Sequence, residues 1–249
     1  MYQYNNQTGQ YASELFPSLW KSPEELNRAT TSCLTRVFLR MFAALLVTAA
    51  AAFAVASSDA LQSLIFSSPY TFIVLIVAEV GLVIAISAGL KRMSSTAANA
   101  LFFTYAIING LTLSSIFLVY ELGVIYHAFA VSALMFAGMA LYGTITKRDL
   151  SSIGSICIMA LFGVIIASIA NVLFFRSEMV ESIVLYIGVV VFVGLTVYDV
   201  QRIKRMLAGA NAASQDDAIK KISVMGALSL YLDFINLFLR LLRIVGRRR

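Results

Sequence analysis

The chain has 249 residues, of which 60% are hydrophobic and 13% are charged, and its formal net charge is +6. A soluble domain carries about 25% charged residues, so this composition, with a mean hydropathy of +0.85, excludes an ordinary soluble globular protein. Apolar stretches of about 20 residues recur along the chain, and they lack the two-residue alternation of barrel strands. We therefore predict an all-α membrane protein.

The first 33 residues are expected to form a cytoplasmic N-terminal tail. Their sequence begins MYQYNNQTGQYASELFPSLW, which is polar and lacks the apolar core of a signal peptide. Residues 34–249 are expected to form the transmembrane domain.

Seven apolar stretches in this domain fit transmembrane helices. The connections between them are short, so any chemistry must lie within the bundle. Proline occurs only at positions 17, 23 and 69, so no predicted helix is interrupted by proline in the way that many transporter helices are. The predicted spans are 34–56, 70–90, 100–120, 124–145, 152–174, 183–203 and 221–245.

The distribution of Lys and Arg predicts the orientation. With the N-terminus in the cytoplasm, nearly all basic residues up to the sixth span fall on the inner side, and the outer loops hold only Arg176. Seven crossings place the basic C-terminal tail outside, against this rule. We expect a full seventh span; a re-entrant last segment is the alternative. The basic residues flank the spans, where they set the topology and contact anionic lipid, and no motif of a nucleic-acid-binding module appears, so we expect no nucleic-acid partner.

Three acids lie inside predicted spans, namely Glu79, Asp199 and Asp233. An ionisable residue in a membrane helix costs about 2.5–3.5 kcal/mol on insertion scales and commonly marks a functional site. Each acid could also be a structural hydrogen-bond or salt-bridge partner. Three of them in different helices of one bundle favour a shared polar site.

The depths of these acids follow from the helical rise of about 1.5 Å per residue. Asp199 is predicted roughly 6 Å, and Asp233 roughly 18 Å, from the inner edge, a gap of about 12 Å that helix tilt can reduce. Arg92 lies at the inner end of the second span, within reach of the aspartates. Glu79 and Arg243 form a possible second ion pair at another depth.

Two carboxylates at close range cannot both ionise at low cost, and they tend to share a proton. Such a pair changes its charge with pH, and when it is deprotonated it can bind a cation. Calcium prefers carboxylate oxygens, so the predicted metal ligands are Asp199 and Asp233. Tyr198 and Asn236 could add oxygen atoms, or could simply form hydrogen bonds between helices.

Four segments together closely resemble the Bax inhibitor-1 family, also called the transmembrane Bax inhibitor motif proteins. The resemblance covers essentially the whole membrane region. It is carried by AEVGLVIAISAGLKRM (78–93), NGLTLSSIF (109–117), VYDVQRIK (197–204) and SLYLDFINLFLRLLRI (229–244).

The resemblance implies a seven-helix bundle with the last helix central, acting as a pH-sensitive calcium leak channel. The paired aspartates that sense pH and bind the ion fall on Asp199 and Asp233. The arginine latch falls on Arg92, and a further ion pair falls on Glu79 and Arg243. The resemblance also supports a full seventh span.

Three other functions are compatible with the sequence. Buried carboxylates also serve proton-coupled transporters. An interaction protein that regulates membrane stress through protein partners is another alternative, and that role is compatible with a leak. An intramembrane aspartyl protease is a remote alternative, because the second aspartate follows Leu230, Tyr231 and Leu232 in place of the Gly-x-Gly motif, and no proline follows Pro69.

We therefore expect a protein that is not an enzyme and has no resident cofactor, with calcium as the permeating ion. The expected partners are membrane lipid, calcium and protons, and no protein partner is indicated. The expected location is a bacterial inner membrane, with a eukaryotic internal membrane as the alternative.

Overall fold

The computed structural model describes residues 23–90, 92–208 and 215–247. Residues 1–22 of the predicted tail lie outside this range. The described elements are all helical. They are α2 (Pro23–Ala56), α3 (Asp59–Phe66), α4 (Pro69–Gly89), α5 (Ser95–Leu113), α6 (Ile116–Val119), α7 (Leu122–Ile145), α8 (Ser151–Ala170), the π-helical turn η1 (Asn171–Phe175), α9 (Glu178–Ala208) and α10 (Gln215–Gly246).

Serine residues mark the starts of several helices. The side-chain oxygens of Ser58, Ser68 and Ser94 each accept a hydrogen bond from a backbone amide two or three residues later. These bonds satisfy amides that have no partner within the helix. Pro69 begins α4, at a position where its missing N–H costs nothing. Local sequence therefore fixes where α3, α4 and α5 begin.

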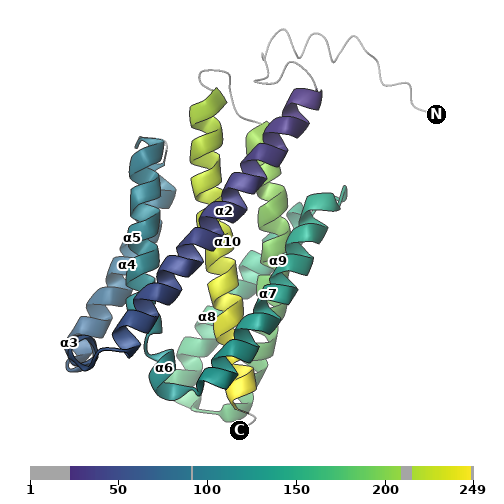
Figure 1. Cartoon of the computed structure of the whole chain (residues 1–249). Helices are drawn as coiled ribbons and strands as arrows, with labels where there is room; N and C mark the ends of the chain where they lie inside the picture. Colours follow the sequence, from purple (N-terminus) through teal and green to yellow (C-terminus); the bar gives the residue numbers. More distant parts are fainter. Residues whose placement is uncertain (1–22, 91, 209–214, 248–249) are drawn as a thin grey trace.

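Helix α10 lies at the centre of the bundle (Figure 1). It packs against α9, α2, α7 and α5, whereas α4 packs mainly against α5 and α8 against α9. Of the most apolar stretch of α10, 67% is buried, compared with 6–44% for the other helices that could cross a membrane. This distribution confirms the prediction of a central last helix.

The structure confirms seven helices that are long and apolar enough to cross a membrane in the described part of the chain. Helix α10 is unbroken over 32 residues, about 48 Å, and a bilayer core is roughly 30 Å thick. This length favours a full seventh crossing over a re-entrant segment. We call the end of the bundle near the start of α10 the inner end, because the charge bias assigns it to the cytoplasm, and the opposite end the outer end.

The element boundaries differ from the sequence prediction at several places, and α9 and α10 both extend beyond the predicted spans. Helix α2 begins at Pro23, so the predicted domain boundary after residue 33 falls inside a helix. The third span divides into α5 and α6, where the hydroxyls of Ser114 and Ser115 donate to backbone carbonyls three residues back and compete with regular helix bonding. The fifth span ends in η1, which Arg176 closes with a left-handed backbone (φ 47°).

Candidate functional site

Asp199 and Asp233 lie on α9 and α10, the pair of helices with the most extensive contact in the bundle. Both residues are buried, with exposed fractions of 9% and 5%. Their carboxyl groups are close enough to interact electrostatically. The structure therefore places the two acids that the sequence singled out within electrostatic range of each other.

Ser229 indicates the level at which the two acids meet. Its side chain is the hydrogen-bonding neighbour of Asp199, and it precedes Asp233 by about one helical turn, roughly 6 Å. Asp233 therefore lies about one turn nearer the outer end than Asp199. This separation is smaller than the gap of about 12 Å estimated from the sequence for untilted helices.

One oxygen of Asp233 has no hydrogen-bond partner. Its Oδ2 atom is fully buried and unbonded within residues 23–90, 92–208 and 215–247. The thiol of Cys157 on α8 lies within electrostatic range of the same carboxyl group. A buried polar atom without a partner costs free energy, so this oxygen is available to a proton, a water molecule or a cation.

The cation beside Asp199 is Arg202, whose Nη1 atom lies 4.0 Å from the Asp199 Oδ1 atom. The next arginine of α9, Arg205, instead donates to Asp149 Oδ1 at 3.1 Å. Hydrogen bonds from the Ser151 hydroxyl and amide, together with the Arg205 charge, hold the pKa of Asp149 below its ordinary value. Arg205 is thus engaged with the loop between α7 and α8, and Arg202 remains as the neighbour of the aspartate.

Arg92, the predicted latch, lies in the turn after α4 and is exposed. It forms no ion pair with Asp199 or Asp233 in the described structure. The reason lies in the packing, since α4 packs mainly against α5 and only α5 continues the contact to α10. In this conformation the structure does not bring Arg92 to the aspartates, and its role as a latch stays a prediction.

Glu79 takes part in a polar network that connects four helices. Its carboxylate accepts hydrogen bonds from Asn109 Nδ2 at 3.1 Å and from the Thr112 hydroxyl. The Tyr231 hydroxyl on α10 donates to Asn109 Oδ1 at 3.0 Å and lies 2.6 Å from Thr48 Oγ1 on α2. This network joins α4, α5, α10 and α2 on the side of α10 away from Asp233.

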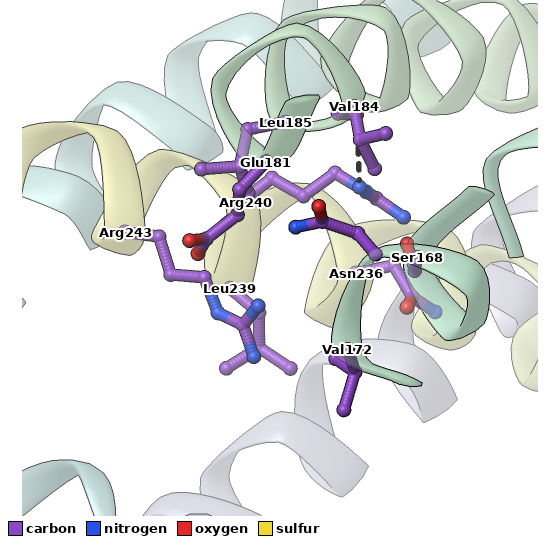
Figure 2. Close-up of a pocket in the computed structure, with 10 residues that line it drawn as sticks. Ser168, Val172, Glu181, Val184, Leu185, Asn236, Leu239, Arg240 and Arg243 are labelled. Carbon is purple, nitrogen blue, oxygen red and sulfur yellow. Dashed lines mark hydrogen bonds between the residues drawn. The ribbon is translucent and has the colours of Figure 1, made fainter. Parts of the chain in front are cut away.

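The structure does not form the predicted pair of Glu79 and Arg243. The Glu79 carboxylate accepts its hydrogen bonds from side chains of α5. Arg243 instead lines a cavity at the outer end of α10, beside α9 (Figure 2). The predicted pairing fails because α4 lies on the periphery of the bundle and α5 separates it from α10.

Several residues of these clusters were not identified from the sequence. Two of them, Ser229 and Arg202, lie within four residues of a named acid in the sequence. The other two, Tyr231 and Thr48, lie in apolar helices. No sequence pattern identifies the partner of any of these residues. Tyr231 could have been identified as part of a polar cluster, because a phenol at the centre of a buried helix needs a hydrogen-bond partner. No sequence pattern indicates that this partner is Asn109.

Tyr198 and Asn236, suggested as further oxygen donors, form ordinary contacts. The Tyr198 ring packs closely on Gly154 of α8, and Asn236 donates to the carbonyl of Leu232 at 2.8 Å. Among the residues that the structure describes, no group of three or more His, Cys, Asp and Glu side chains could hold a metal ion. The aspartate pair therefore has few protein ligands for calcium, which usually takes six to eight oxygen atoms.

Comparison with known proteins identifies the family. The family model described as "Inhibitor of apoptosis-promoting Bax1" matches residues 30–249. The chain is 46% identical over 217 residues to the "Inner membrane protein YbhL" of Escherichia coli K12, covering 87% of this chain and 92% of that protein. It is 45% identical to an uncharacterized protein of Borreliella burgdorferi over 218 residues, with the same shares of the two chains.

A membrane protein of Streptococcus pyogenes of uncharacterized function is 41% identical over 166 residues, or 67% of this chain and 70% of that protein. Together with the seven apolar helices, these relatives support a multi-pass protein of a bacterial inner membrane. The chain belongs to the Bax inhibitor-1 family.

Proposed function

We propose that this protein is a calcium leak channel whose conductance depends on the protonation of Asp199 and Asp233. The observation that carries the proposal is the burial of these two interacting carboxyl groups on the central pair of helices, with one oxygen of Asp233 unbonded. In this proposal calcium is the permeating ion, and the protein has neither a catalytic role nor a resident cofactor.

The chemistry follows from the burial of both carboxyl groups on α9 and α10. Two carboxylates that interact in a low-dielectric environment do not both carry a full charge at low cost, so they share a proton. Loss of that proton leaves a doubly negative site that attracts a divalent cation. Because the protein supplies few oxygen ligands, the ion would keep part of its water shell and bind weakly enough to leave, as conduction requires.

The test uses calcium flux into proteoliposomes that contain only this protein, measured across about pH 5–8, the range in which such a pair can titrate. Asp199→Asn and Asp233→Asn each keep the side-chain shape and remove the titration. We expect each change to flatten the dependence of flux on pH. The double variant should add little to either single one, since the two residues act as a unit.

Asp149→Asn is the matched control, because Asp149 is an exposed acid in the loop between α7 and α8. It should leave the pH profile unchanged. A profile that keeps its midpoint and steepness in Asp233→Asn, or effects of the two aspartates that simply add, would contradict the proposal.

Proton-coupled transport is the second candidate, and the network from Glu79 through Asn109 to Tyr231 is the observation that favours it. Chains of acids and hydroxyl groups in membrane helices can serve as proton relays. A radiolabelled solute that leaves the liposomes only when a pH gradient is imposed would support transport. Calcium flux that persists without a gradient would support the leak.

A further inference from the structure

A polar cavity lies at the outer end of the bundle, where the ends of α8 and α10 meet the start of α9 (Figure 2). Its volume is about 340 Å³, which falls in the lower range of small-molecule sites. The polar side chains that line it are those of Ser168, Asn171, Glu181, Asn236, Arg240 and Arg243.

Arg240 is the most constrained cation of this cavity. Its guanidinium group lies on Gly188, where a Cβ atom would collide with it, and its central carbon lies 5.2 Å from the centre of the Phe192 ring. Nη1 donates a long hydrogen bond of 3.4 Å to the carbonyl of Val184. The Nε atom is buried and has no hydrogen-bond partner in the described structure. The donors of Arg240 are therefore incompletely used.

The charges around the cavity do not balance. Glu181 is the acid of the lining, and it forms an ion pair with Arg247. Arg240 and Arg243 have no carboxylate at ion-pair distance among the described side chains. Arg243 is exposed at the rim, while Arg240 is half-buried in the wall. A desolvated cation without a counterion is costly, so this arrangement favours an anionic ligand.

We propose that this cavity binds an oxyanion, either a phosphate or a carboxylate group, between Arg240 and Arg243. Guanidinium groups match the geometry of such anions and form strong charge-assisted hydrogen bonds with them. The anion could be the phosphate of an acidic membrane lipid or that of a small soluble molecule, because the cavity opens near the outer end of the helices. This proposal does not depend on calcium conduction.

The first arm of the test uses purified protein in a neutral detergent, with inorganic phosphate as the probe. Phosphate should raise the thermal unfolding midpoint of the wild type in a saturable manner. Arg240→Gln and Arg243→Gln should each raise the phosphate Kd at least about tenfold, a loss consistent with one charged hydrogen bond. Arg176→Gln, an exposed arginine of the same outer end, is the control and should leave the Kd unchanged.

The second arm identifies the source of the anion. Protein is reconstituted in nanodiscs of phosphatidylcholine with or without phosphatidylglycerol, and bound lipid is measured by native mass spectrometry. Retention of phosphatidylglycerol by the wild type, with loss in both cavity variants, supports a lipid ligand. Phosphate binding without such retention supports a soluble ligand.

Two results would overturn the proposal. One is that neither probe binds the wild type, and the other is that binding is unaffected by both cavity variants or is reduced equally by Arg176→Gln. If Arg240→Gln does not fold, Arg243→Gln at the rim and Arg240→Lys, which retains the charge, keep the test decisive. Arg240→Lys should bind phosphate more tightly than Arg243→Gln does.

Discussion

Arg202 is the cation that stands beside the buried acids, at 4.0 Å from Asp199 and partly exposed at the inner end of α9. If its charge helps to hold the closed state, Arg202→Gln should raise calcium flux at neutral pH. Partly exposed ion pairs contribute about 0.2–1 kcal/mol, so the increase should be about 1.5- to 5-fold. The measurement is the initial rate of calcium entry into proteoliposomes.

Arg202→Lys, which keeps the charge, serves as the control and should resemble the wild type. Arg92→Ala is measured alongside it. A rise in flux for Arg92→Ala with none for Arg202→Gln would assign the latch to Arg92, in a conformation that brings the turn after α4 closer to the aspartates than it lies here.

For individual residues, the sequence identified the acids in the membrane helices but not the side chains that contact them. Asp199 and Asp233 are conspicuous because a charge in an apolar helix is rare and costly. The partner of each acid depends on where the helices end and how they pack. Glu79 shows this clearly, since its hydrogen bonds go to Asn109 and Thr112 on the neighbouring helix and not to the arginine that the sequence suggested.

Among the helices, close approach depends on glycine at particular positions. A Cβ atom on Gly110 of α5 would lie 2.5 Å from the Thr48 carbonyl oxygen and 2.7 Å from the Ala51 Cβ atom, so α2 and α5 touch through their backbones there. Small residues commonly allow such contacts in membrane bundles. Gly81 on α4, in contrast, has nothing within 4 Å of its Cβ position.

These two glycines give a matched pair of substitutions. Gly110→Ala should lower the free energy of unfolding by about 1–3 kcal/mol, because the α2 backbone must move. Gly81→Ala should be neutral or stabilising by up to about 1 kcal/mol, since alanine favours the helix. Thermal unfolding in detergent measures both. Equal effects of the two substitutions would show that α2 and α5 are not tightly packed at Gly110.

The positions of the helices in the chain were predictable, whereas several of their boundaries were not. Apolar runs of about 20 residues are a strong signal, and each predicted span overlaps one of the seven helical segments that are long enough to cross a membrane. The break between α5 and α6 depends on Ser114 and Ser115, whose hydroxyls bond to the backbone in a way that sequence hydropathy does not detect. The first residues of α2 are polar, so in the sequence they resemble part of the N-terminal tail.

For the molecule as a whole, the direction of α10 decides the topology. A cysteine inserted after Gly246, in a variant that lacks Cys33 and Cys157, should react with a membrane-impermeant thiol reagent added to intact cells. The reason is the unbroken 32-residue length of α10, which carries its end to the side of the membrane opposite its start.

Lys147→Cys provides the comparison, because Lys147 is exposed in the loop between α7 and α8 at the inner end. It should react only after the inner face is made accessible. The reverse pattern of labelling would invert the orientation, and protection of both cysteines in intact cells would show that the chain returns to the inner side.

The enclosure of α10 by α2, α5, α7 and α9 restricts how this helix can move. It cannot swing sideways without separating its neighbours, so the movements left to it are rotation about its axis and sliding along it. Tyr231 and Asp233 point to opposite sides of the helix, toward Asn109 and toward α9. A rotation of α10 that separates the two aspartates must therefore also move Tyr231 away from Asn109. The two polar clusters are thus coupled, because both change when α10 rotates.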